Sequence, residues 1–238
     1  MEEVDRYHSF FHPILNIFNY DGIFVPKQNS PGFKLGWFSD GCALFWKRDK
    51  FELITKVTNS FKVGNQKYII ATLFHRDSGR TIVVAVTHLK AQNNSTCEKI
   101  RTQQANELID SVNNVIHTVA SNDNLPTTSI PTILMGDFNS DPDGDEKTCI
   151  KSVLSRRPQL SSVYDLERHN FFTTWKSRGH KTARRIIDYI FYNDSKGFRC
   201  SHVLSIPKDE QIEATKLPGF RYPSDHLSIG SKFELDSI

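Results

Sequence analysis

The segment Ile130-Pro-Thr-Ile-Leu-Met-Gly-Asp-Phe-Asn139 is the part of the sequence on which the fold prediction depends most. Residues 130–135 form a short apolar run that ends at Gly136, which is typical of a buried strand. Two polar side chains, Asp137 and Asn139, follow directly. Gly-Asp and Asn-Ser-Asp-Pro are also ordinary turn sequences, so this segment alone does not distinguish a functional site from a turn.

Three other segments repeat the same design, in which an expected strand carries or meets a polar residue. They are Thr87-His88-Leu89-Lys90, Ile187-Asp188-Tyr189 and Ser224-Asp225-His226. A carboxylate inside an apolar run, as at position 188, is costly unless it is paired. His88 or the Asp-His pair would be unremarkable alone. Because α/β scaffolds gather functional side chains at strand ends, the combination predicts one site.

Strand and helix patterns alternate around these segments. Strands are predicted at Cys42–Trp46, Phe51–Thr58, Tyr68–Phe74, Thr81–Thr87, Phe171–Trp175, Arg185–Tyr192, His202–Ile206 and Leu227–Phe233. Helices are predicted over residues 5–16, Glu98–Ala120 and near Asp145–Leu154, and long loops over 27–41 and 207–224. Strands dominate and helices interrupt them. The sequence therefore predicts a single α/β domain over residues 1–238, with two packed, mainly antiparallel sheets flanked by helices.

Composition narrows the class of protein. The 238 residues suffice for one sizeable core, and the net charge of +3 suits an anionic substrate but is too small to indicate a broad nucleic-acid surface. The four cysteines are scattered without zinc-finger spacing, so we expect reduced thiols. No apolar run is long enough to span a membrane. We expect a cytoplasmic protein, or a mitochondrial one if a targeting segment lies upstream.

Phosphate-ester hydrolysis is the chemistry that these residue types fit. It needs a cation at the phosphoryl oxygens, a base that directs a water in line, and donors for the developing charge. Magnesium prefers oxygen ligands, and manganese can take its place. The candidate oxygen ligands are Glu3, Asp137, Asp188 and Asp225, and the candidate donors are His88, His226, Asn139 and Lys90.

Together these segments resemble the endonuclease/exonuclease/phosphatase superfamily, in particular its deadenylase-like branch. The blocks that carry the resemblance are Glu3-Val4-Asp5, Asp40-Gly41-Cys42-Ala43, Thr87–Ala91, Arg101 with Gln104, Gly136–Asn139, Ile187–Ile190 and Ser224–Ser228. The resemblance implies a DNase I-like four-layer sandwich. It also implies that the usual first strands are absent, so we expect a domain truncated at its N-terminus.

The resemblance also implies roles for individual residues. Glu3 and Asp225 would serve the metal. Asp137 would activate the water, and Asp188 would brace His226. The expected catalytic residues are Asp137, Asn139, His226, His88 and Asp188, and the expected substrate-binding residues are Lys27, Lys90, Asn65 and Gln66. One departure is Gln92, which stands where the resemblance leads us to expect an arginine that would bind phosphate.

Three functions remain open on the sequence. The first, which the resemblance implies, is removal of the 2′-phosphate from NADP(H), or from another adenine-containing phosphate substrate, by in-line attack of water. The second is a poly(A)-specific 3′ exoribonuclease that acts on mRNA and would need a basic, aromatic track. The third is an inactive, truncated form that binds a ligand or partner. No particular protein partner can be inferred.

Overall fold

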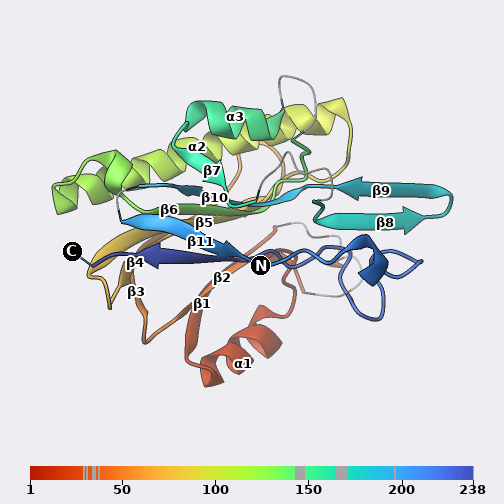
Figure 1. Ribbon diagram of the computed structural model, residues 1–238, viewed down its shortest axis with the longest axis horizontal. Helices are drawn as coiled ribbons and strands as arrows, with labels where there is room; N and C mark the ends of the chain where they lie inside the picture. Colours follow the sequence, from red (N-terminus) through yellow and green to blue (C-terminus); the bar gives the residue numbers. More distant parts are fainter. Residues whose placement is uncertain are drawn as a thin grey trace.

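The computed structural model describes the chain except for residues 29, 31, 34–35, 37, 143–147, 165–170, 196 and 238, and the side chain at position 178. The fold has four layers (Figure 1): two helices, a six-stranded sheet, a second layer of paired strands, and a short N-terminal helix. This is the layered α/β architecture that the sequence predicted.

The six-stranded sheet is the centre of the fold. Its strands follow the order β3-β4-β5-β6-β10-β7, and every neighbouring pair is antiparallel except β5 and β6, which are parallel. The strands are β3 (Phe51–Ser60), β4 (Lys67–His75), β5 (Arg80–His88), β6 (Thr132–Asp137), β7 (Leu160–Ser162) and β10 (Asp188–Asn193). A parallel pair needs a crossover, which α2 (Ser95–Asp123) supplies.

The two faces of this sheet are covered differently. Helices α2 and α3 (Cys149–Arg156) lie on one face, and the strand pairs β1–β2 and β11–β12 lie on the other (Figure 1). These strands are β1 (Tyr20–Pro26), β2 (Gly41–Lys47), β11 (Phe198–Val203) and β12 (Ser231–Leu235). Outside β1 and β2 lie η1 (Tyr7–Phe11) and α1 (His12–Ile17), and the short helices η3 (Thr127–Ser129) and η4 (Asp209–Gln211) lie in loops.

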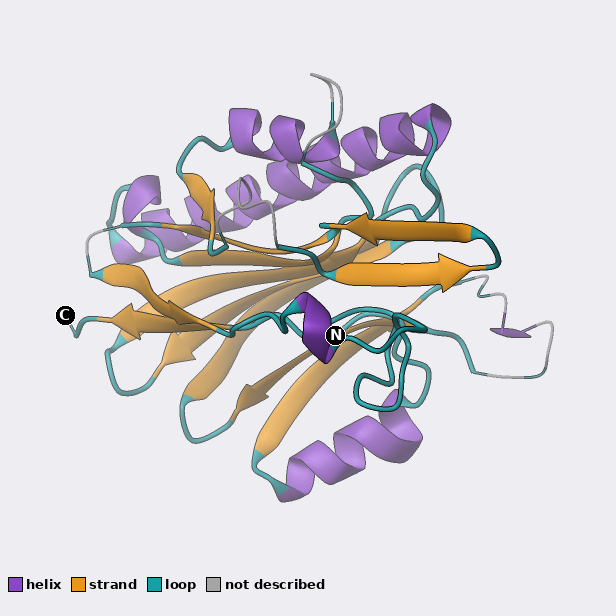
Figure 2. Cartoon of the chain, turned by 45° about the vertical axis from the view of Figure 1, so that its right-hand side comes forward, coloured by secondary structure: helices purple, strands orange, loops and turns teal. Residues whose placement is uncertain are grey.

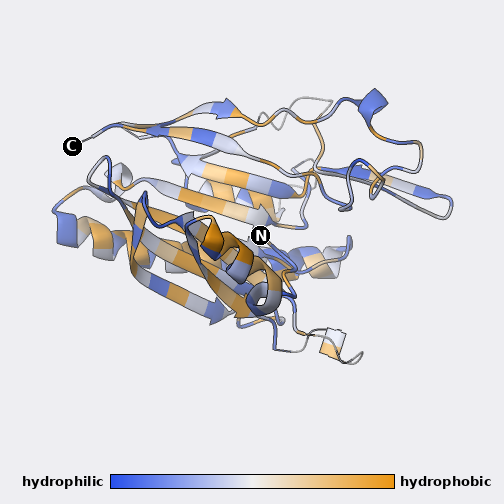
Figure 3. Cartoon of the chain, turned by 90° about the horizontal axis from the view of Figure 1, so that it is seen from below, coloured by the Kyte–Doolittle hydropathy of each residue, from blue (hydrophilic) through white to orange (hydrophobic). Residues whose placement is uncertain are grey.

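Burial on both faces explains the long apolar runs of β4 and β5. Tyr68 and Ile70 pack with α2, whereas Ile69 and Ala71 pack with β1 and β2, so successive residues enter different cores. Figure 3 shows hydrophobic residues concentrated in the strands of the sheets. A strand buried on both sides reads as a continuous apolar run instead of an alternating one.

A hairpin stands apart from these layers. Strands β8 (Thr174–Arg178) and β9 (Lys181–Arg185) form a two-stranded sheet of their own and project beyond the neighbouring strands (Figure 2). The predicted strand Arg185–Tyr192 is in fact divided between β9 and β10, and Phe171–Trp175 enters a strand only at its end. Lys181–Arg185 is polar and exposed over its first three residues, so no apolar periodicity marks it.

Strand β7 of the six-stranded sheet was not predicted, because its three residues are too few to show an apolar pattern. Other differences concern the second layer. Strand β1 was not predicted, because Gly22 and Pro26 interrupt its apolar pattern. Strands β11 and β12 begin four residues away from the predicted starts at His202 and Leu227. The start predicted for the helix near Asp145–Leu154 lies outside the described residues. Among the helices of the described part of the chain, none is both long and apolar enough to cross a membrane.

Candidate active site

Strand register brings three of the predicted residues together. Because β5 and β6 are parallel, His88 lies directly opposite Asp137 at the ends of the two strands. Strand β10 starts on the other side of β6, where Asp188 is also opposite Asp137. The His88 Nε2 atom is 3.6 Å from Asp137 Oδ2. Three neighbouring strands therefore place a histidine and two carboxylates in one row at one edge of the sheet.

The turn after β6 fixes the direction of Asp137. Gly136 has a φ of +145°, and a Cβ atom at this position would lie 1.9 Å from the Thr87 carbonyl oxygen, so only glycine fits. Asn139 is left-handed, with a φ of +53°, a conformation that asparagine tolerates. Its backbone N–H donates to Asp137 Oδ1 at 2.7 Å, and its side-chain amide donates to the Leu89 carbonyl at 3.2 Å. The sharp turn thus holds the carboxylate and links it to the loop after β5.

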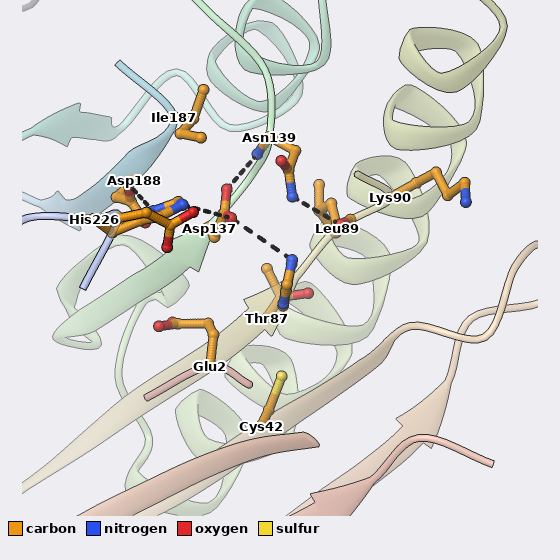
Figure 4. A network of polar contacts seen from close by, with 12 residues as sticks. Glu2, Cys42, Thr87, Leu89, Lys90, Asp137, Asn139, Ile187, Asp188 and His226 are labelled. Carbon is orange, nitrogen blue, oxygen red and sulfur yellow. Dashed lines mark hydrogen bonds and ion pairs between the residues drawn. The ribbon is translucent and has the colours of Figure 1, made fainter. Parts of the chain in front are cut away.

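His226 closes the cluster from a distant part of the chain (Figure 4). An isolated bridge pairs its backbone with Thr174. Its Nδ1 lies 2.9 Å and 3.0 Å from the two oxygens of Asp188, and its Nε2 lies 4.0 Å from Asp137 Oδ2. A carboxylate at Nδ1 fixes one tautomer and ring orientation. The predicted bracing of His226 by Asp188 matches this geometry.

Burial and neighbouring charges set the electrostatics of the cluster. Burial, followed by the negative charge of Asp188, raises the pKa of Asp137 to about 8. Burial alone would lower the pKa of His226, but the hydrogen bond and charge of Asp188 and the charge of Asp137 outweigh it, so the net shift is upward. Burial and the nearby Lys27 ammonium lower the pKa of His88 to about 3. The site therefore holds a neutral histidine beside carboxylates that repel one another.

Of the two N-terminal glutamates, Glu2 is the one that enters the site. Its side chain points toward the cluster (Figure 4), and burial raises its pKa. The predicted ligand Glu3 is exposed, with a φ of +53°. Because Val4 is buried and paired with Gly41, the left-handed backbone at position 3 turns that side chain outward. A cavity of about 410 Å³ lies at the cluster. Its lining includes both glutamates and His88, Asp137 and His226.

The cluster fits a divalent metal. Asp137, Asp188 and His226 offer ligand atoms that all lie within 4.8 Å of one another. Burial is the largest cause of the raised pKa values of Asp137 and Glu2, so both carboxyl groups are withdrawn from water beside these ligand atoms. The Nδ1 atom of His88 is buried without a hydrogen-bond partner among the described residues, so the site has unused polar capacity.

The predicted substrate residues surround the cluster at different distances. The Lys27 ammonium is paired with the Asp40 carboxylate, which also accepts from the Ser30 hydroxyl and has a lowered pKa, because these contacts outweigh burial. Lys90 points away from the carboxylates (Figure 4). Asn65 accepts from the Gln66 amide at 2.9 Å, in the loop before β4. Among these residues, Lys27 lies near enough to the cluster for its charge to lower the pKa of His88.

Polar residues of α2 hold the loops that carry these side chains. Gln104 accepts from the Lys90 backbone N–H at 3.0 Å and donates to Gln66 at 2.9 Å. Arg101 is fully buried and donates to the carbonyl groups of Lys90, at 2.8 Å, and Gln92, at 2.7 Å. Its partner Glu98 accepts from the Ser140 hydroxyl at 2.6 Å. One helix thus positions three loops of the site.

Asp225 takes a different contact from the predicted one. Its Oδ2 is 2.6 Å from the Lys176 ammonium, and this contact outweighs burial in lowering the pKa of Asp225. Lys176 and Glu2 are therefore the residues at the site that sequence reasoning missed. In the sequence, Lys176 lies in a basic stretch with Lys181, Arg184 and Arg185, a pattern usual for a solvated loop, and His226, which it contacts, is 50 residues away in the chain.

The matches to known proteins agree with this geometry. Residues 1–226 match the model of the endonuclease/exonuclease/phosphatase family. The chain belongs to this family. Mouse nocturnin is 34% identical over 247 residues, which is 99% of this chain and 54% of nocturnin. The 3′-5′ exoribonuclease subunit Ccr4 of Kluyveromyces lactis is 23% identical over 286 residues, with 99% and 35% covered.

A solved structure confirms the fold. The human nocturnin catalytic domain with a bound sulfate anion superposes with a TM-score of 0.79 and 31% identity, covering 98% of this chain and 79% of that one. The chain spans about half the length of mouse nocturnin. The predicted resemblance to nocturnin, which rests also on Phe24–Lys27 and Leu217–His226, is confirmed.

Proposed function

We propose that the chain is a magnesium-dependent phosphoesterase that removes the 2′-phosphate of NADP(H), with manganese able to replace magnesium. The observation that carries the proposal is the meeting of His88, Asp137 and Asp188 at three adjacent strand ends, closed by His226. In-line hydrolysis requires carboxylates for the metal and the attacking water, histidines as donors, and a cavity that holds the phosphate ester. The resemblance to nocturnin favours a compact dinucleotide as the substrate, and so does the small net charge.

The acid–base roles follow from the contacts. Asp137 orients the attacking water and accepts its proton, while the Asn139 backbone N–H holds the other carboxylate oxygen. A metal held by these residues would supply positive charge at the phosphoryl oxygens and would favour the ionised form of the carboxylates around it. Glu2 or Glu3, Asp188 and Asp225 are the remaining carboxylates that could serve it.

The histidines and amides serve the phosphoryl group. Asp188 holds Nδ1 of His226, which leaves Nε2 to face a phosphoryl oxygen. His88 is neutral and buried at the other side of Asp137, where it is a second polar contact for the substrate. Asn139 would contact the scissile phosphate. Its amide must then leave the Leu89 carbonyl, which it contacts at 3.2 Å.

A second phosphate of the dinucleotide would meet the lysines. Lys27 is held beside His88 by Asp40, and its charge reaches the imidazole. Lys90 can contact a phosphate only if its side chain rotates toward the cavity. The side chain of Gln104 links the Lys90 backbone to Gln66, and Gln66 contacts Asn65. Gln92 has no charge, so we expect weaker binding at this second phosphate than an arginine would give.

A poly(A)-specific 3′ exoribonuclease is the second candidate. The similarity to the exoribonuclease subunit Ccr4 favours it, and so does the basic β8–β9 hairpin beside the site. The hairpin offers Trp175, whose ring lies 3.8 Å from the Lys216 ammonium. A stacking aromatic among cations suits single-stranded RNA. The third candidate, an inactive form that binds a ligand or partner, is the outcome in which neither substrate is cleaved.

One experiment separates the three candidates. Phosphate release from NADP⁺ and NADPH is measured with magnesium and with a chelator, and an adenosine oligomer is incubated in parallel and resolved by length. Magnesium-dependent phosphate release that Asp137→Asn abolishes supports the phosphatase. Asp77→Asn is the matched control, because Asp77 is exposed and pairs with Lys50. Shortening of the oligomer without phosphate release would replace the proposal with the exoribonuclease, and a folded but inactive protein would replace it with the third candidate.

A further inference from the structure

Lys176 is a cation that contacts His226. It lies on β8, with its Nζ atom 3.2 Å from His226 Nε2 and 2.6 Å from Asp225 Oδ2. Its side chain is 24% exposed, so Lys176 is partly buried at the site. The backbone bridge between Thr174 and His226 and a 2.7 Å bond from the Thr174 hydroxyl to the Asp225 carbonyl hold β8 against this segment.

The other cations of the hairpin have different partners. Arg184 donates to both oxygens of Asp209, at 2.8 Å and 3.0 Å. Arg185 donates to Asp141 at 3.1 Å. Lys181 is exposed near the hairpin turn. Of these four basic residues, Lys176 contacts His226, whereas Arg185 also donates to the Asn139 carbonyl group at 3.3 Å.

The contact with His226 reveals which side of the ring Lys176 occupies. Asp188 faces Nδ1, so Nε2 is the ring nitrogen that remains for a substrate. An ammonium group has donors and no acceptor, so it donates to Nε2 when the imidazole is neutral, whereas a protonated His226 presents its Nε2–H to the substrate. A phosphoryl oxygen that contacts Nε2 would lie about 2.8 Å from it, on the same side of the ring as the ammonium.

We propose that Lys176 is a catalytic residue, whose ammonium binds a non-bridging oxygen of the scissile phosphoryl group beside His226. The inference rests on the proposed phosphoesterase function and adds a residue to it. A lysine has four rotatable side-chain bonds, so a small rotation moves the ammonium from His226 Nε2 to a phosphoryl oxygen bound beside that atom. Asp225 holds the ammonium from the other side and keeps it near the cavity. The charge that develops on the oxygen in the transition state strengthens this contact.

A purely structural role predicts a different behaviour. If Lys176 only joins the hairpin to the Asp225 segment, its loss lowers thermal stability but leaves turnover of the folded enzyme unchanged. A contact with the phosphoryl oxygen instead affects the turnover number kcat more than KM, because it is strongest in the transition state. The geometry can therefore be tested by kinetics together with ligand binding.

The experiment compares Lys176→Met, Lys176→Arg and the matched control Lys181→Met, each in the full chain. With NADP⁺ and magnesium, we expect Lys176→Met to lower kcat by about 100-fold with less than about a threefold change in KM. Lys176→Arg should recover at least about tenfold of that loss, since it keeps the charge. The thermal midpoints of the variants identify any that fail to fold, and Lys176→Arg keeps the test decisive if Lys176→Met does not fold.

Orthovanadate binding, measured by calorimetry, provides a readout that does not depend on turnover. We expect Lys176→Met to weaken it at least about tenfold and Lys181→Met to leave it unchanged. A folded Lys176→Met variant with wild-type kcat and wild-type vanadate affinity would overturn the inference while leaving the phosphoesterase function intact. If the wild-type chain releases no phosphate, the proposed function fails first, and vanadate binding then decides the role of Lys176 alone.

Discussion

Replacing Arg101 with methionine tests how far α2 holds the site together. Arg101 is fully buried, and its guanidinium bonds Glu98 at 2.8 Å and the carbonyl groups of Lys90 and Gln92. Methionine fills much of the same space with a flexible apolar chain and offers no donor. The substitution therefore removes these hydrogen bonds without creating a large void.

The size of the loss follows from the partners that remain. Each of the two carbonyl groups loses a buried donor, which costs about 1 kcal/mol at the low end of the usual range. Removing one partner of a fully buried ion pair costs about 3–5 kcal/mol. The side chain of Glu98 is 24% exposed, however, and it keeps the Ser140 hydroxyl and the Cys149 N–H, so we assign about 1 kcal/mol to it. The sum is about 3 kcal/mol.

Urea unfolding followed by circular dichroism measures this loss. We expect the free energy of unfolding of Arg101→Met to fall by about 3 kcal/mol with an unchanged dependence on urea. The control is Arg76→Met, which removes an ion pair with Glu52 in which both side chains are about half exposed, and it should cost less than about 1 kcal/mol. A loss below about 1 kcal/mol for Arg101→Met would refute the reasoning that these buried contacts hold the loops.

Two further predictions concern the stability of the protein. Without metal, the raised pKa values of Asp137, about 8, and of His226 mean that the native state binds more protons than the unfolded state above pH 6.5, so the free energy of unfolding should fall from about pH 6.5 to 8. His88, with a pKa of about 3, makes the free energy of unfolding rise with pH, but only below pH 6.5. Urea unfolding in the presence of a chelator should show the fall in the free energy of unfolding between about pH 6.5 and 8, and Asp137→Asn should reduce this fall. A free energy of unfolding that does not change with pH in the wild-type protein would contradict the prediction. Asn193→Leu should lower the free energy of unfolding by about 3 kcal/mol in the same assay. The fully buried Asn193 amide accepts from the Thr132 backbone N–H at 2.6 Å and donates to the Ile130 carbonyl group at 2.9 Å, at the start of β6. Asn114→Leu, at an exposed position of α2, should stay within about 0.5 kcal/mol, and an equal effect of the two would exclude this role of Asn193.

Strand ends were the part of the site that the sequence could predict. Asp137 and His88 each follow an apolar run, and Asp188 lies inside one, so all three were recognisable as polar residues where a strand places them. The neighbouring positions of β5, β6 and β10 then bring them together through backbone register alone. No knowledge of side-chain packing is needed for this step, which is why these residues were found.

Contacts that depend on irregular backbone could not be predicted in this way. Glu2 points toward the cluster, where Glu3 was expected, because the backbone of Glu3 is left-handed, and a strand pattern in the sequence does not predict such a conformation. Lys176 reaches His226 through an isolated bridge instead of a ladder. The hairpin that carries it has an exposed second strand, so its residues resemble a solvated loop. Both misses lie where backbone geometry, and not hydropathy, determines the position of a side chain.

Helix α2 shows which further signal the sequence contained. Glu98, Arg101 and Gln104 are spaced three residues apart, and the apolar side of the helix continues with Leu108. Residues at this spacing share one face, so polar groups here enter the core side of an amphipathic helix. A buried charge persists only when it is paired and fully hydrogen-bonded. Polar residues on the apolar face of α2 therefore indicated loops that needed donors and acceptors, and the loops that they hold are those that carry Lys90 and the residues after Asn139.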